Sequence, residues 1–196
     1  MKIGITGGIG SGKSYVCRLL ADYGITVYDC DSAAKRLMRE DANLRAQLTS
    51  LIGPDTYRQV VDADGNPVWQ LNKQAVATFL LASEANAQAI NAIVHPAVFH
   101  DFETSGMQWM ESAILYESGI SKLVDRIVAV TAPESVRIQR ITQRDGIAPE
   151  KAREWIARQW SQEKVRQLAD FEIINDGQQP LKPQIEKLLS YLKGQN

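Results

Sequence analysis

The feature that most constrains the fold of this chain is a cluster of glycines directly after a short apolar run. Residues 7–14, called the glycine loop below, read GGIGSGKS. Each glycine destabilises a helix or strand by roughly 0.5–1 kcal/mol relative to alanine, so the cluster must provide something that other residues cannot. Apolar residues before it predict a strand, and helical spacing of apolar residues after it predicts a helix. The chain therefore opens with strand, glycine loop and helix.

The glycine loop matches the pattern G-x-x-x-x-G-K-[ST], with Gly7, Gly12, Lys13 and Ser14 at the fixed positions. In this pattern successive backbone N–H groups point inward around an anion, which the N-terminus of the following helix also favours. Lys13 is expected to reach the β- and γ-phosphates of a nucleotide, and the Ser14 hydroxyl to bind Mg²⁺. The residues expected to contact the nucleotide here are Gly8, Ile9, Gly10, Ser11, Gly12, Lys13, Ser14 and Tyr15.

The rest of the chain alternates between strand-like and helical segments, which is typical of a parallel α/β sheet. Strands are expected at residues 2–6, 25–28, 111–116, 125–131 and 171–174. Outside the middle of the chain, helices are expected at 13–23, 31–38, 134–144, 149–161 and 183–192. The middle holds alanine-rich helical stretches at 75–82, 85–94 and 97–104, a turn-rich stretch at 62–69, and no strand expected to join the sheet. We predict about five parallel strands with helices on both faces and a helical insertion.

Composition and charge exclude several classes of protein. The 196 residues are 44% hydrophobic and 23% charged, as in an average globular domain. The formal net charge of −1 gives no broad basic field for nucleic acid or a membrane surface. No secretory pattern and no apolar run near the roughly 18 residues of a membrane span are found. We expect a cytoplasmic protein, or an organellar one after processing, with Cys17 and Cys30 as buried thiols.

A phosphate-binding loop alone does not distinguish a small-molecule kinase, a GTPase switch and an ATP-driven motor. The only Asn-Lys pair, at 72–73, is followed by Gln-Ala, so the N-K-x-D signature of a guanine-specific GTPase is missing. A motor would be longer and would carry an apolar strand ending in Asp or Asp-Glu, whereas AILYE ends here at Glu117. A kinase needs an acceptor carboxylate, a cationic lid and an acceptor pocket.

The chain offers candidates for the carboxylate and for the lid. YDCD places Asp29 and Asp31 after the second expected strand, at the sheet edge where ligands bind, and on one face of an extended segment. A helix N-cap at Asp31 and a solvated turn at Asp29 would account for the same residues. Arg137, Arg140 and Arg144 share one helical face that ends in an RDG turn. This stripe is either a solvated basic face or a glycine-hinged lid.

These segments together resemble the dephospho-CoA kinase family, over nearly the whole chain. The matching segments are TGGIGSGKS at 6–14, YDCDSAAKRL at 28–37, VHP at 94–96, QRDG at 143–146, Gln159 with EK at 163–164, AD at 169–170 and IINDG at 173–177. The resemblance implies a three-layer P-loop kinase fold in a single domain. Its core would span about 1–40 and 109–196, its acceptor-binding helical insertion about 41–108, and its arginine-bearing lid about 137–162.

The resemblance also implies a reaction and its partners. The γ-phosphoryl group of ATP would pass to the ribose 3′-hydroxyl of dephospho-CoA, with Mg²⁺ as cofactor, giving coenzyme A and ADP. The expected partners are these small molecules, without nucleic acid or membrane, and the protein is expected to be a monomer or a weak homo-oligomer. Two alternatives stay open: another small-molecule or nucleotide kinase of the same fold, and a nucleotide-dependent switch protein.

Individual roles follow from the same resemblance. Asp31 would act on the acceptor hydroxyl as an acid/base or orienting group, and Asp29 would support the acceptor or the hydrated metal. Lys13 and Arg140 would act in catalysis, and Arg140 with Arg144 would close on the ATP phosphates. A further pair, Asn175 and Gly177, lies where the family packs the adenine ring.

Two more residues are expected on the acceptor side. His95 precedes Pro96, which suits a first helical position, so His95 either begins a helix or faces the CoA-side pocket, and we expect the pocket. Glu117 ends AILYE, where the family often has Pro-Leu-Leu-Phe-Glu, and would bind the acceptor or hold a metal-bound water. Because the proline is absent here, the backbone path before Glu117 stays open.

Overall fold

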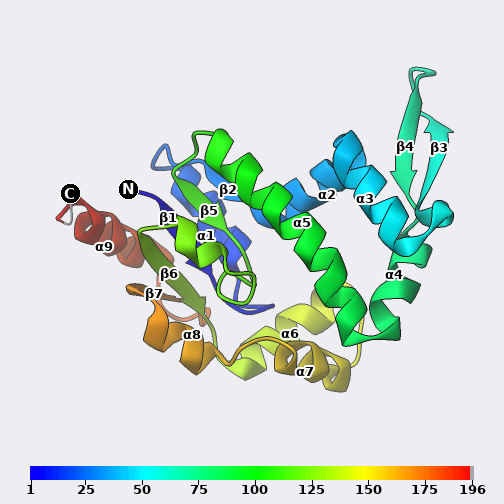
Figure 1. The fold of residues 1–196 in the computed structure, drawn as a ribbon. Coiled ribbons are helices and arrows are strands. Elements are labelled where there is room, and N and C mark those ends of the chain that lie inside the picture. The colour runs from blue at the N-terminus through cyan, green and yellow to red at the C-terminus, as the bar shows by residue number, and fades with distance from the viewer. Residues whose placement is uncertain (195–196) are drawn as a thin grey trace. The chain divides into compact units, whose positions relative to one another are not determined.

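A computed structural model describes residues 1–194 of the chain, which divides into two compact units. The first unit is formed by residues 1–29 together with the chain from Gly106 onward, and the second by Cys30–Ser105 (Figure 1). No helix within the described residues is both long and apolar enough to cross a membrane.

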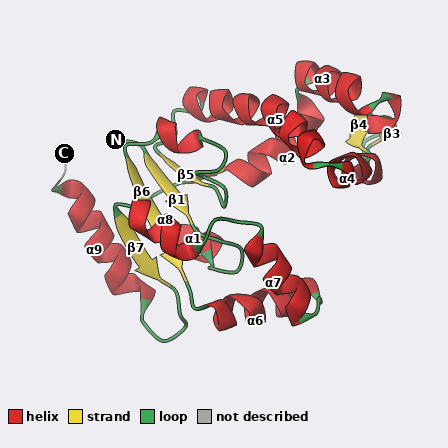
Figure 2. Cartoon of the chain, turned by 60° about the horizontal axis from the view of Figure 1, so that its bottom comes forward, coloured by secondary structure: helices red, strands yellow, loops and turns green. Residues whose placement is uncertain are grey.

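The first unit is built on a five-stranded sheet whose neighbouring strands are all parallel. Its strands, in spatial order, are β2 (Val27–Asp29), β5 (Trp109–Glu111), β1 (Ile3–Thr6), β6 (Arg126–Thr131) and β7 (Phe171–Ile174). All four residues of β1 are buried, because the central strand of a covered parallel sheet meets no solvent on either face. The sheet and its flanking helices confirm the predicted fold class (Figure 2).

Helices cover this sheet and complete the core of the first unit. They are α1 (Lys13–Ala21), the 3₁₀ helix η2 (Ile120–Leu123), α6 (Glu134–Asp145), α7 (Pro149–Ala157), α8 (Gln162–Leu168) and α9 (Leu181–Lys193). Leu20 of α1 and Leu188 of α9 are fully buried in one cluster with Ile5 and Ile173 of the strands. Each such side chain stabilises the fold by roughly 1.5–3 kcal/mol. This packing holds the C-terminal ends of the strands, and the loops that follow them, in fixed positions.

The second unit, Cys30–Ser105, is mostly helical. It contains α2 (Cys30–Glu40), α3 (Ala42–Ile52), the 3₁₀ helix η1 (Pro54–Thr56), β3 (Tyr57–Val61), β4 (Pro67–Leu71), α4 (Lys73–Ala82) and α5 (Glu84–Thr104). The turn-rich stretch at 62–69 forms the tip and the start of the second strand of an antiparallel β3–β4 hairpin, which does not join the central sheet. At its tip, Asp62 Oδ1 accepts from the N–H groups of Asp64 and Asn66.

The strand expected at 111–116 is wrong. β5 ends at Glu111, and the N–H of Ser118 donates to the Ile114 carbonyl at 2.8 Å, so the chain turns there. Leu115 within the turn and Ile120 after it are both fully buried. An apolar run of this length reads as strand or as buried turn equally well, and tertiary packing decides between them.

Two helix boundaries also differ from the prediction. The helix expected at 149–161 ends at Ala157, and a separate α8 begins at Gln162. The stretches 85–94 and 97–104 are one helix, α5, with Pro96 inside it. His95 therefore does not begin a helix, although proline normally interrupts one by removing an N–H donor. Instead, the His95 ring stacks on Phe99 with centroids 6.0 Å apart.

Candidate functional site

The glycine loop joins β1 to α1 and takes a conformation that only glycine allows at its key positions. Gly12 precedes α1 with φ 88°, in the left-handed region. A Cβ at Gly12 would lie 2.1 Å from Asn175 Nδ2, and one at Gly7 would lie 2.1 Å from the Val130 carbonyl oxygen. The loop is thus packed against the ends of β6 and β7, so the glycines are required for close approach as well as for turning.

Side chains from α6 and from the end of β7 bind the carbonyl oxygens of the loop. Arg140 Nη1 donates to the carbonyls of Gly10 and Ser11 at 3.4 and 3.2 Å. Asn175 Nδ2 donates to the Ser11 carbonyl at 2.9 Å, and its Oδ1 accepts from Arg140 Nη2 at 3.3 Å. Arg140 and Asn175 thus lie together at the loop.

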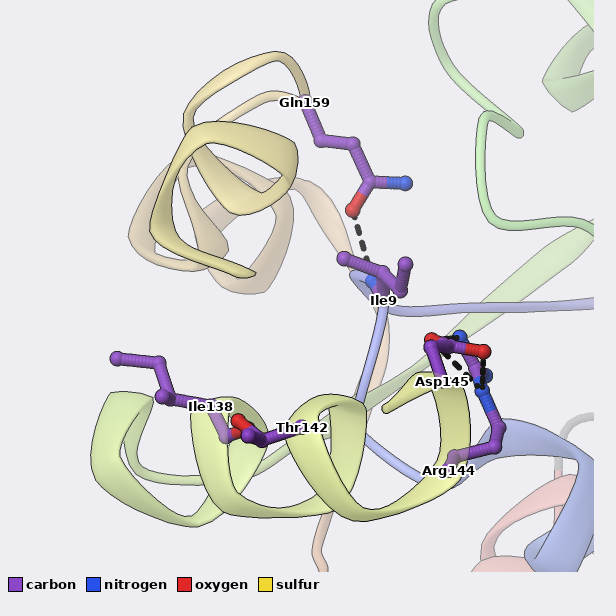
Figure 3. Close-up of polar contacts among 6 residues, drawn as sticks. All are labelled: Ile9, Ile138, Thr142, Arg144, Asp145 and Gln159. Carbon is purple, nitrogen blue, oxygen red and sulfur yellow. Dashed lines mark hydrogen bonds and ion pairs between the residues drawn. The ribbon is translucent and has the colours of Figure 1, made fainter. Parts of the chain in front are cut away.

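The arginine stripe of α6 is divided by the structure. Arg137 is buried and its Nε donates to the Ile9 carbonyl at 2.9 Å, while burial lowers the pKa of its guanidinium. Arg144 instead pairs with Asp145 at 2.7 Å and is largely exposed (Figure 3). The shared face expected for the three arginines therefore brings Arg137 and Arg140, but not Arg144, to the loop. Gly146 ends α6 in a left-handed conformation, which allows the chain to turn into α7.

A carboxylate that the sequence analysis did not single out lies beside Ser14. The hydroxyl of Ser14 donates to Glu111 at 3.2 Å, and Glu111 pairs in register with Asp29 on the neighbouring strand. Burial raises the pKa of Glu111, and the charge of Asp29 raises it further, while Lys13 and the Ser14 hydroxyl lower it. Lys13 also donates from Nζ to the Gly7 carbonyl at 2.8 Å. In the sequence, the signal for Glu111 is a carboxylate that directly follows the apolar pair Trp109 and Met110.

These oxygen atoms suit a magnesium ion. Mg²⁺ is held in proteins by one or two carboxylates together with waters and substrate phosphates. The Ser14 hydroxyl and the Glu111 carboxylate are donors of that kind, with Asp29 on the adjacent strand. Among residues 1–194 no group of three or more His, Cys, Asp and Glu side chains could hold a metal ion. The Ser14 and Glu111 oxygens are part of the donor set that Mg²⁺ prefers, and phosphate oxygens would have to supply the rest.

The remaining predicted residues occupy varied positions. Glu117 does not end a strand, and its Oε1 accepts from the Trp160 N–H at 3.2 Å, so the carboxylate at the end of this strand is Glu111. Asp31 lies within the first turn of α2, which begins at Cys30, so it does not precede the helix as an N-cap. Tyr15 is exposed in the first turn of α1, and Gly177 follows β7 with φ 83°.

Two titratable side chains stay neutral because of burial. Burial lowers the pKa of His95, so its imidazole is uncharged at neutral pH. Burial, with the charge of Glu111, strongly raises the pKa of Cys17, so this thiol carries no charge. Cys30 is buried as predicted, whereas Cys17 is only partly buried.

Replacing Glu111 with glutamine is expected to stabilise the fold at neutral pH. The pKa of Glu111 is raised in the folded state. Its contribution to the free energy of unfolding is therefore fully present below the ordinary glutamate pKa, and it is lost as the pH rises through the raised folded-state pKa. Glutamine keeps an acceptor for Ser14 without the buried charge, which is worth on the order of 1 kcal/mol. The thermal midpoints of wild type and Glu111→Gln should coincide near pH 4 and separate by pH 8. The exposed Glu103→Gln is the control, and a midpoint difference that does not change with pH would contradict the argument.

Comparison with known sequences gives one consistent result. Residues 1–180 match the sequence profile of the dephospho-CoA kinase family. A protein named dephospho-CoA kinase from Bacteroides fragilis is 41% identical, over 98% of this chain and 93% of that protein. One from Chlorobaculum tepidum is 36% identical, over 97% of this chain and 94% of that protein.

Solved structures show the same fold. A Thermus thermophilus protein, TT1252, has a TM-score of 0.77 and 27% identity, covering 100% of this chain and 97% of its own. A dephospho-CoA kinase from Campylobacter jejuni gives 0.60 and 17%, with coverages of 98% and 96%. A shikimate kinase from Acinetobacter baumannii gives 0.56 and 16%, with coverages of 100% and 94%. The first unit therefore has the P-loop kinase architecture.

Proposed function

The chain belongs to the dephospho-CoA kinase family, and from this membership we propose that it transfers the γ-phosphoryl group of ATP to the ribose 3′-hydroxyl of dephospho-CoA. The products are coenzyme A and ADP, in the final step of coenzyme A biosynthesis. The observation that carries the proposal is the glycine loop, whose carbonyls are bound by Arg140 and Asn175 while Ser14 faces Glu111. That arrangement suits a triphosphate and a divalent cation.

The nucleotide side of the site would be formed by the first unit. The loop from Gly8 to Tyr15 would bind the phosphates through backbone N–H groups other than that of Ile9, which donates to Gln159. Lys13 would exchange the Gly7 carbonyl for the β- and γ-phosphates. Arg140 lies at the loop and would offset charge on the transferring group. In this proposal Arg144 leaves Asp145 to reach the phosphates, and Asn175 and Gly177 border the adenine.

On the metal side, Ser14 and Glu111 would hold Mg²⁺, with Asp29 next to them. When bound, the ion neutralises charge on the β- and γ-phosphate oxygens. Glu117 is not needed in this role, because its carboxylate is engaged by the backbone of Trp160. Ser14 is exposed on the helix surface and is accessible to such an ion.

On the acceptor side, Asp31 would orient the 3′-hydroxyl and accept its proton. The bond from the hydroxyl oxygen to the γ-phosphorus would form as the bond from that phosphorus to the bridging oxygen breaks, releasing ADP. Its carboxylate comes two residues after Asp29, which ends β2 at the C-terminal edge of the sheet. His95 would contribute a neutral imidazole to the CoA-binding side, since burial keeps it uncharged. We propose the helical insertion as the acceptor-binding part of a single kinase domain, and residues 137–162 as its lid.

The near-neutral net charge supports small-molecule partners rather than nucleic acid. We propose a cytoplasmic enzyme that is a monomer or a weak homo-oligomer. A kinase with another acceptor, or a nucleotide switch, is disfavoured by the family membership.

A coupled assay of ADP release, with ATP and Mg²⁺ and with or without dephospho-CoA, tests the proposed function. We expect ADP release to depend on dephospho-CoA, and mass analysis to find one added phosphate on it. If ATP binds and no phosphate reaches dephospho-CoA, the acceptor assignment is wrong. ATP binding with a conformational response and no phosphorylated small molecule would instead support a switch.

A further inference from the structure

Residue Ile9, at the tip of the glycine loop, is held on both sides by side chains far away in the sequence. Its N–H donates to Gln159 Oε1 at 2.7 Å, from the connector between α7 and α8 (Figure 3). Its carbonyl accepts from Arg137 Nε at 2.9 Å, from α6. The two peptide groups that flank the Ile9 side chain are therefore each bound by one side chain, and neither of these bonds comes from regular secondary structure.

Arg137 is suited to this role by its burial. Only 5% of its surface is exposed, and a Cβ on Gly8 would lie 2.3 Å from its Nη2. The side chain thus packs against the loop backbone and leaves no room beside Gly8. A buried guanidinium is costly unless its donors are used, and the Ile9 carbonyl uses one of them. Arg137 is therefore buried against the loop backbone and bonded to it through the Ile9 carbonyl.

Gln159 is held in place by its neighbour in the connector. The Trp160 ring stacks on Tyr116 with centroids 5.8 Å apart and 7° between planes, and Lys164 Nζ lies 3.2 Å from the centre of the Trp160 ring. The backbone N–H of Trp160 donates to Glu117 Oε1. These contacts anchor the connector to the turn after β5, so Gln159 presents its amide oxygen to Ile9 from a rigid support. This gives Glu117 a structural role in the same assembly.

We propose that Gln159 and Arg137 are positioning residues that hold the glycine loop in its phosphate-binding conformation. The proposal rests on the proposed function, in which this loop binds the ATP phosphates. With either bond removed, the peptide groups around Ile9 can rotate, and nucleotide binding must then order them again. Because the loop contacts the phosphates before and during transfer, the loss appears as weaker ATP binding rather than as a slower chemical step.

The test compares Gln159→Ala with Gln184→Ala. Gln184 is a matched control, since its Oε1 also accepts one backbone N–H, that of Ile174 at 2.8 Å, outside the glycine loop and the proposed lid. For Gln159→Ala we expect the Kd of ATP, measured by calorimetry, and the KM of ATP to rise roughly tenfold, with kcat and the KM of dephospho-CoA within twofold. Gln184→Ala should leave all four values within twofold. The thermal midpoints of both variants show that they are folded.

A double substitution adds a second readout. If Arg137 and Gln159 act together on Ile9, Arg137→Met and Gln159→Met combined should weaken ATP binding no more than the worse single variant. Equal ATP affinity in wild type and Gln159→Ala, or an equal loss in Gln184→Ala, would overturn the positioning role. Wild-type protein that binds ATP without phosphorylating dephospho-CoA would instead contradict the proposed function, and calorimetry would still decide the role of Gln159.

Discussion

Asp31→Asn is expected to lower kcat for phosphoryl transfer to dephospho-CoA by roughly 10²–10⁴-fold. Asparagine has nearly the same shape as aspartate but cannot accept the proton of the acceptor hydroxyl. The affinity for ATP should change by less than about twofold, because the glycine loop and its supporting side chains are unaltered. Steady-state kinetics with dephospho-CoA, together with calorimetry of ATP binding, separates the two effects.

Asp41→Asn provides the matched control for Asp31→Asn. Asp41 also lies in the second unit, where its side chain caps α3 by accepting from the N–H of Leu44 at 2.9 Å. Asparagine caps a helix about as well as aspartate, so both stability and kcat should be retained. If Asp31→Asn keeps kcat within twofold, the acceptor carboxylate is a different residue, and Asp29 is the next to replace. If both variants lose activity together, the effect comes from the folding of the unit.

Gly12→Ala is expected to abolish measurable ATP binding and to destabilise the fold. The added Cβ would lie 2.1 Å from Asn175 Nδ2, and the backbone at φ 88° is strained for any residue with a side chain. Since Asn175 is buried, it cannot move aside without giving up its bonds to the Ser11 carbonyl and to Arg140. Thermal unfolding and ATP calorimetry measure the two consequences.

Gly24→Ala separates backbone strain from the damage to the loop. Gly24 has a similar φ of 73°, but a Cβ there meets nothing within 4 Å. It should lose roughly 1–3 kcal/mol of stability and keep its ATP affinity. If Gly12→Ala binds ATP as well as Gly24→Ala does, the contact of Asn175 with the loop is dispensable for binding.

The parts of the fold that could be predicted from the sequence depend on local patterns. The glycine loop was predictable because its glycines, Lys13 and Ser14 are contiguous, and because apolar periodicity distinguishes the strand before it from the helix after it. β7 was predicted with its observed bounds for a related reason: a short apolar run ends at the Asn-Asp-Gly turn. In both cases the information lies within a few residues.

Other features were ambiguous at short range. The run that ends at Glu117 is as apolar as a strand, yet it turns after Glu111 so that Leu115 becomes buried. The carboxylate at the end of this strand is therefore Glu111 and not Glu117. Pro96 was expected near a helix start and lies inside α5, because packing of Val94 and Val98 outweighs one missing hydrogen bond. Helix packing of this kind cannot be seen in the spacing of a few residues.

The residues that support the glycine loop could be identified only in the folded chain. Ile9 bonds to side chains 128 and 150 positions away, and Ser11 to one 164 positions away. A basic stripe on a helix has the same sequence whether it faces water or a backbone carbonyl, and the structure alone places Arg137 on the loop and Arg144 outside it. The chemistry of the phosphate-binding residues is thus encoded in contiguous sequence, because it needs a turn and a helix start. Their rigidity depends on tertiary packing, because the side chains that bond to the loop lie 128 to 164 positions away from the loop residues they contact.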